Sequence, residues 1–181
     1  LTSPFAGKQK NLFLNNSLAP RSPRWHPPCT DRHTHWYTTR YAIVLGWTID
    51  QWRAAYRKKN VTPVSAMKAL SAQLQDSERA LWIHLLDESS LLAQAERLSD
   101  PSLPLYGVPF AVKDNIDVGS LPTTAACPAY TYTAKETAPA VQALLDAGAI
   151  LVGKTNLDQL ATGLVGVRSP YGEVPNPFNP D

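Results

Sequence analysis

A continuous aliphatic run at residues 149–152 constrains the fold of this chain more than any other feature. It lacks the polar alternation of a half-exposed strand, which is typical of a strand that is covered on both faces. The helical pattern of residues 139–146 precedes it, and Gly148 suits the end of that helix. Residues 156–161 have the pattern of another helix. This succession of helix, glycine, buried strand and helix predicts an α/β fold.

The preceding part of the chain predicts further elements of both kinds. Thr48 followed by Gln51 has the form of a capping box, which begins a helix. Thr62 before Pro63 marks another helix start, and Asp87 suits a third. The expected elements are helices over 48–57, 62–74 and 88–98, a compact apolar run at 80–86 that fits either a strand or a helix, and a short buried strand over 110–112 that ends at Lys113.

The first 45 residues differ in composition from the rest. They carry six basic residues against one acidic residue, and they are rich in proline, histidine, asparagine and threonine without a sustained period. Such a segment buries too little apolar surface to offset the entropy lost on ordering. We therefore expect a disordered extension over residues 1–45 and a folded region over residues 46–181.

Composition also limits the class of protein. No segment approaches the roughly 20 apolar residues of a membrane helix. Cys29 and Cys127 give no disulfide framework, which suits a reducing compartment. We expect a soluble, cytoplasmic protein. The scattered cations of the N-terminal segment do not form a nucleic-acid-binding patch. Cys29, His33 and His35, with His26 nearby, are metal-ligand types, but no second cysteine pair or helical frame supports a site. We expect no metal.

Residues Gly148 to Thr155 match the phosphate-loop pattern G-x-x-x-x-G-K-[ST] letter for letter. In a true phosphate loop a strand precedes the first glycine, and the variable residues cradle the phosphates. Here a helical pattern precedes Gly148, and the variable residues are aliphatic strand formers. A buried strand is therefore the favoured interpretation, and a nucleotide-binding protein remains the alternative of a different class. A non-catalytic truncated product is a third interpretation.

Lys113 is the main candidate for chemistry. Side chains alternate along a strand, so Lys113 shares a face with Ala111 and Pro109. The small neighbour leaves room around the amine, and burial disfavours a charged lysine, which makes it a usable base. In the alternative interpretation, Lys113 merely ends the strand and its amine reaches water. The local pattern alone favours this alternative.

Two long stretches shift that balance, because together they resemble the amidase-signature family. Residues 107–115 read GVPFAVKDN, and residues 146–158 read DAGAILVGKTNLD. The resemblance extends from about residue 47 to residue 181. Within the family, residues 121–130 and 161–172 resemble the allophanate hydrolase branch, whereas the amidotransferase and fatty-amide branches usually read differently there. Cys127 in the first of these is a weaker candidate nucleophile, because no partner histidine is identifiable.

The resemblance implies a partial amidase-signature fold, in which helices flank a mixed sheet. It implies a Ser–Ser–Lys triad in which Lys113 is the terminal proton acceptor, with no cofactor. The family places both serines and the oxyanion-stabilising amides in a Gly/Ser-rich run shortly after a segment matched by Asn179–Asp181. We therefore expect residues 46–181 to be the N-terminal part of such a domain, truncated before its catalytic loop and inactive alone.

The resemblance also implies a small amide substrate, with allophanate hydrolysed to ammonia and carbon dioxide. Another amidase of the family, or an A-type subunit of an amidotransferase, is the alternative. A homodimer, and a functional link or fusion to a biotin-dependent urea carboxylase, are the partners that remain open. No nucleic acid and no membrane are expected.

Overall fold

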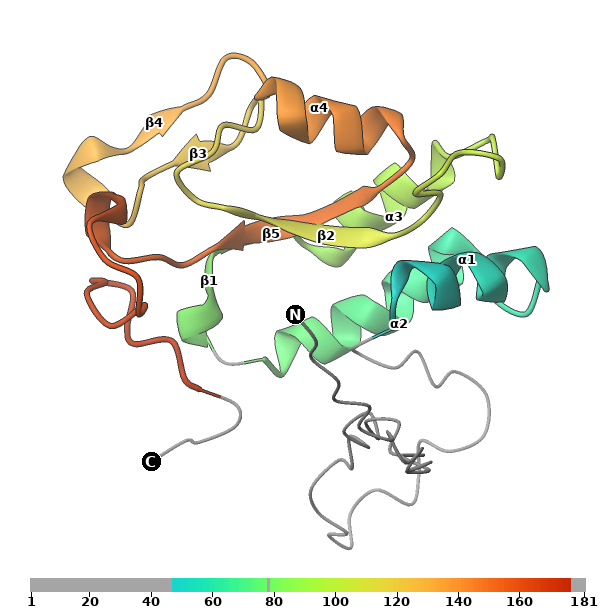
Figure 1. Cartoon of the computed structure of the whole chain (residues 1–181), viewed down its shortest axis with the longest axis horizontal. Helices are drawn as coiled ribbons and strands as arrows, with labels where there is room; N and C mark the ends of the chain where they lie inside the picture. The colour runs from blue at the N-terminus through green and yellow to red at the C-terminus, as the bar shows by residue number, and fades with distance from the viewer. Residues whose placement is uncertain (1–46, 78, 177–181) are drawn as a thin grey trace, which may run out of the picture. The chain divides into compact units, whose positions relative to one another are not determined.

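The computed structural model of this chain describes residues 47–77 and 79–176 (Figure 1). The extension expected at residues 1–45 lies outside this range, as do the metal-ligand candidates Cys29, His33 and His35 with their neighbour His26. Those expectations stay predictions. None of the helices in the described part is long and apolar enough to cross a membrane.

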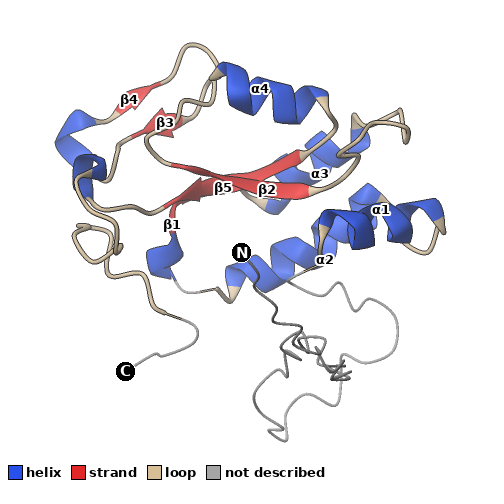
Figure 2. Cartoon of the chain, in the orientation of Figure 1, coloured by secondary structure: helices blue, strands red, loops and turns tan. Residues whose placement is uncertain are grey.

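A mixed three-stranded sheet organises the described residues, with the strand order β1-β5-β2. Strand β1 (Trp82–Leu85) pairs antiparallel with β5 (Ile150–Thr155), and β2 (Pro109–Lys113) pairs with β5 in parallel. Two very short strands, β3 (Pro122–Thr123) and β4 (Tyr132–Thr133), form a separate antiparallel pair (Figure 2). The predicted mixed sheet with flanking helices is confirmed.

The helices begin where the sequence predicts. They are α1 (Ile49–Arg57), α2 (Pro63–Gln75), α3 (Glu88–Glu96) and α4 (Pro139–Asp146). Thr48 and Gln51 form a reciprocal capping box at α1, because each side chain bonds the backbone N–H of the other residue. Thr62 caps α2, and the Asp87 carboxylate accepts a 2.8 Å bond from the Ser90 N–H at α3. Each cap satisfies N–H groups that have no partner within the helix.

The sheet separates two apolar clusters. On one face, Ile150 and Val152 of β5 pack with side chains of α1, α2 and α3, including the fully buried Met67 and Leu91. On the other face, Leu151 packs with Val112, Val118 and Val141, the last of which lies on α4. In Figure 1, α4 lies on one side of the sheet and α1 and α2 on the other. The prediction that residues 149–152 form a strand covered on both faces is confirmed.

A register shift changes the direction of the side chains in the second half of β5. Phe110 pairs with Leu151 and Ala111 pairs with Gly153, so β2 skips Val152. Strict alternation would place Lys154 on the face of Ile150 and Val152, among the helices. The extra residue of a bulge reverses that alternation. The amine of Lys154 consequently reaches the segment around β3.

The predicted helix at residues 156–161 is wrong. The structure has only a 3-10 turn, Gln159–Ala161, and both Leu160 (φ 53°) and Ala161 (φ 57°) are left-handed. The carboxylate of Asp158 instead bonds backbone N–H groups of the following loop. Those long-range bonds override the local helical pattern. The predicted loop after residue 162 is confirmed through residue 176.

Candidate active site

Lys113 ends β2, and its register partner is Thr155 of β5. Its side chain is exposed, and so is that of Ala111 on the same strand. The buried niche expected around Lys113 is therefore not formed by the described residues. The physical reason is that β2 is an edge strand of the described sheet, so only one side of it is paired. At this position the structure agrees with the alternative interpretation, in which the amine reaches water.

The next residue, Asp114, is fully buried beside a buried lysine. Its Oδ1 lies 3.1 Å from Nζ of Lys154, and both side chains are 0% exposed. This contact is an ion pair without the alignment of a hydrogen bond. The Lys154 ammonium also donates to the carbonyl of Pro122 and to Oγ1 of Thr123, at 2.7 Å each. Three oxygens thus surround an ammonium group that has three protons to donate.

The second oxygen of Asp114 is bound just as closely. Its Oδ2 accepts bonds from the backbone N–H of Thr124, at 2.9 Å, and from the Thr124 hydroxyl, at 2.6 Å. The same hydroxyl accepts from the N–H of Ala126 at 3.0 Å. We call Asp114, Lys154, Thr123 and Thr124 the buried polar cluster. A buried charge is tolerated only when it is paired and hydrogen-bonded, and this cluster meets that condition.

The turn that follows the buried polar cluster holds an unusual backbone. Ala125 (φ 51°) and Ala126 (φ 55°) are both left-handed, which is costly for residues that carry a Cβ. The N–H of Ala125 bonds the carbonyl of Asp114, and the N–H of Leu160 bonds the carbonyl of Ala125 at 2.8 Å. Leu160 and Ala161 form a second left-handed pair. Such conformations persist where the surrounding structure determines them.

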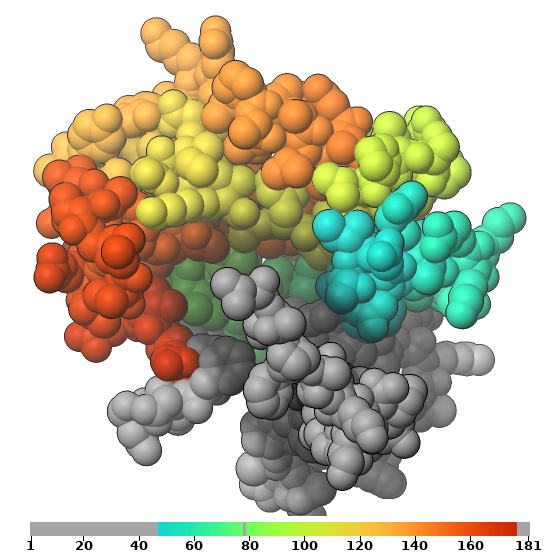
Figure 3. All heavy atoms as spheres, in the orientation of Figure 1, coloured from blue at the N-terminus to red at the C-terminus, as the bar shows by residue number. Residues whose placement is uncertain are grey.

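Asp158 organises the loop that continues from this second pair. Its carboxylate accepts bonds from the N–H groups of Val165, Gly166 and Arg168, at 2.8–3.0 Å. These bonds, from Gly166 above all, hold the pKa of Asp158 below its usual value. A Cβ at Gly163 would collide with the same carboxylate. The loop belongs to the orange-red segment in Figure 3 and carries the exposed apolar side chains of Leu164, Val165 and Val167.

Two other sequence candidates gain no chemical setting here. Cys127 has a free, half-buried thiol and precedes a short 3-10 helix without capping it through its side chain. Across residues 47–77 and 79–176, no group of three or more histidine, cysteine or acidic side chains is placed to hold a metal ion.

The phosphate-loop pattern at Gly148 to Thr155 does not form a phosphate loop. Gly148 follows α4 and takes a left-handed φ of 90°, and residues 150–155 pair with both neighbouring strands. The amine of Lys154, which would contact a phosphate, is held in the buried polar cluster. The alternative of a nucleotide-binding protein is contradicted by this geometry.

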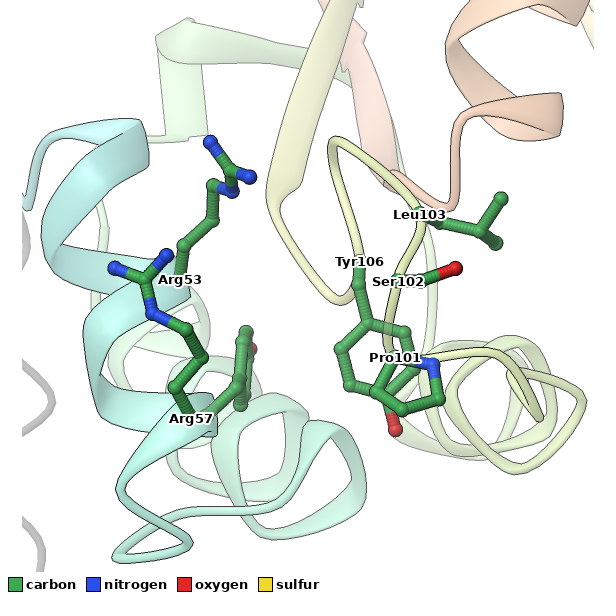
Figure 4. Close-up of a pocket in the computed structure, with 7 residues that line it drawn as sticks. Arg53, Arg57, Pro101, Ser102, Leu103 and Tyr106 are labelled. Carbon is green, nitrogen blue, oxygen red and sulfur yellow. The ribbon is translucent and has the colours of Figure 1, made fainter.

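A cavity of about 220 Å³ lies between α1 and the segment that leads into β2 (Figure 4). Arg53 and Arg57 line one wall, and Pro101 and Tyr106 line the other. The five residues of β2, roughly 16 Å of strand, separate this cavity from Lys113. The cavity therefore does not belong to the site at the other end of the strand.

The comparisons with known proteins agree with this arrangement. The Amidase family model matches residues 65–181. The chain belongs to the amidase family. It is 46% identical over 149 residues to the urea amidolyase of Saccharomyces cerevisiae, which covers 78% of this chain and 8% of that protein. It is 36% identical over 135 residues to the A-type subunit of the glutamyl-tRNA(Gln) amidotransferase of Akkermansia muciniphila, covering 74% of this chain and 28% of that protein.

Solved structures of the family superpose on the same region. The allophanate hydrolase of Kluyveromyces lactis matches with a TM-score of 0.67 and 46% identity, covering 75% of this chain and 23% of that one. The chain thus spans less than a third of the length of each of these relatives. The family and the fold expected from the sequence are both confirmed.

The sequence analysis placed Lys113 at a strand end but missed the buried polar cluster. A signal for it was present, because Lys154 directly follows a run predicted to be a doubly covered strand. A lysine in such a strand requires an acidic partner and further acceptors. The partner, Asp114, lies forty positions earlier in the sequence, next to Lys113.

Proposed function

We propose that this chain supplies the proton-accepting lysine of an amide-hydrolysing site, and that the amidase domain to which it belongs acts on allophanate. The single observation that supports the lysine is its position. Lys113 is exposed at the end of β2, while the adjacent Asp114 is anchored by the buried polar cluster. A rigid strand end that presents a free amine is suited to acid–base chemistry.

In the proposed mechanism, a serine hydroxyl attacks the amide carbonyl while a second serine passes its proton to neutral Lys113. Breakdown of the tetrahedral intermediate releases ammonia and leaves an acyl-enzyme, which water then hydrolyses. The carbamate-type product yields further ammonia and carbon dioxide. Neither serine nor the oxyanion-stabilising donors are assigned to a described residue, so we propose that residues 47–176 alone do not catalyse the reaction.

Similarity to a urea amidolyase and to an allophanate hydrolase, each at 46% identity, supports allophanate as the substrate. It also supports a link to a biotin-dependent urea carboxylase, either on the same polypeptide or as a partner. The 36% identity to an A-type amidotransferase subunit favours glutamine as the second candidate substrate. Ammonia release from allophanate and from glutamine, measured side by side, separates the two candidates.

The role of Lys113 is tested by Lys113→Ala in a complete amidase domain that contains this chain. Loss of a general base lowers turnover by about 10²–10⁴-fold, and we expect kcat for ammonia release from allophanate to fall by that factor. Lys135→Met is the matched control, because Lys135 is exposed on a loop outside the site. Wild-type turnover by Lys113→Ala would remove Lys113 from the mechanism.

A further inference from the structure

We propose that the buried polar cluster is a positioning unit for Lys113. In this inference, which rests on the proposed function, Asp114 and Lys154 fix the direction in which Lys113 leaves the sheet, and Thr124 transmits that constraint to the two turns beside it. None of these three side chains contacts substrate in the proposal. They act through Lys113 and through the backbone.

The first step is the covalent link between Lys113 and Asp114. Consecutive side chains of an extended chain point to opposite sides, and here one is exposed and the other is fully buried. Asp114 is held by Lys154 through one oxygen and by Thr124 through the other, and its N–H bonds the carbonyl of Thr155 at 3.1 Å. With both oxygens and the backbone of Asp114 fixed, the peptide that carries Lys113 has little freedom to rotate.

The second step is the connection from the cluster to the neighbouring turns. The Thr124 hydroxyl donates to Asp114 and accepts from Ala126, so one hydroxyl joins the ion pair to the left-handed turn. That turn in turn holds Leu160 through the carbonyl of Ala125. A continuous series of bonds therefore runs from β5, through Asp114 and Thr124, to the loop that Asp158 organises.

The third step concerns why the cluster is charged. A buried ion pair is weak support for stability, because well-packed apolar residues of similar volume often serve the fold equally well. An ion pair with every oxygen engaged does, however, impose one orientation on its segments. A proton relay depends on orientation, since a misplacement of about 1 Å can reduce turnover roughly 10²-fold. We therefore assign the cluster to positioning.

Thr124→Val and Thr124→Ser test the inference in a complete amidase domain that contains this chain. Valine keeps the shape and removes the hydroxyl, whereas serine keeps the hydroxyl. We expect Thr124→Val to lower kcat by about tenfold or more with KM within about twofold, and Thr124→Ser to restore most of the turnover. Thr131→Val is the control, because it removes an exposed hydroxyl that bonds only the nearby Pro128 carbonyl. Equal kcat for Thr124→Val and the wild type would overturn the inference.

The double variant Asp114→Leu/Lys154→Met decides the question if Thr124→Val does not fold. It removes both charges together and leaves no buried ion unpaired. A folded double variant with turnover reduced by tenfold or more supports positioning, whereas a folded double variant with wild-type turnover shows that the cluster serves the fold alone. Lys113→Ala separates the two proposals. If Lys113→Ala abolishes turnover while the cluster variants remain active, only the positioning inference fails.

Discussion

Strands β5 and β2 run side by side and in parallel, yet they give their lysines opposite environments. In β5, the central strand, five of six residues are buried, whereas β2 has one buried residue among five. Lys154 is fully buried with an anionic partner, and Lys113 is exposed. Both lysines follow short apolar runs in the sequence. The position of a strand within the sheet, rather than its local pattern, therefore decides whether a lysine is buried.

The largest expected effect contrasts the same substitution at these two lysines. Lys154→Met leaves the Asp114 carboxylate buried without its counter-charge, which costs about 3–5 kcal/mol of unfolding free energy. Lys113→Met alters an exposed side chain on the edge strand, and we expect a change within about 0.5 kcal/mol. Urea denaturation of the two variants measures the difference. Equal midpoints would show that the contrast between central and edge strand has no energetic consequence.

A smaller effect is expected where the two strands pair at Gly153 and Ala111. A Cβ at Gly153 would lie 2.6 Å from the carbonyl oxygen of His84, a backbone atom of β1 that moves only with its strand. Overpacking of this kind costs about 1–3 kcal/mol, so we expect Gly153→Ala to lower the thermal midpoint clearly. Ala111→Ser, on the exposed side of the edge strand, is the control with a change within about 0.5 kcal/mol. If both variants melt together, β5 has more room than the central position implies.

Local signals predicted the elements well, because helix starts depend on residues three positions apart. Thr48, Thr62 and Asp87 each cap the helix that the sequence predicts. The helix expected at residues 156–161 failed for the opposite reason. There Asp158 bonds N–H groups seven to ten positions further along the chain, and no helical pattern contains that information.

The site was predictable in position but not in environment. The motif around Lys113 placed it at a strand end, which the structure confirms. Its exposure depends on β2 being an edge strand, which is a property of the sheet. The partner of Lys154 was also beyond reach, because the skipped residue Val152 decides which face Lys154 occupies. Tertiary register, unlike capping, cannot be read from neighbouring residues.

The smallest expected effect extends the comparison beyond the end of β5, to a buried charge whose partners are backbone amides. Bonds from Gly166, Arg168 and Val165 lower the pKa of Asp158 from its ordinary value of 3.8. The folded loop therefore binds a proton less readily than the unfolded loop. Its stabilisation is fully present above about pH 4 and is lost as the pH falls through the lowered pKa.

Amide hydrogen exchange from pH 6 to pH 2, corrected for the intrinsic exchange rate, tests this dependence at single residues. We expect the protection of the Gly166 and Arg168 amides to fall at acid pH, and to be low at all pH values in Asp158→Asn. The Ala66 amide is the internal control, because it bonds the carbonyl of Thr62 in the first turn of α2, where no acidic side chain lies. Protection that stays constant to pH 2 at Gly166 would mean that contacts other than the Asp158 carboxylate hold the loop. The buried carboxylate would then resemble Lys154 in burial but not in organising its surroundings.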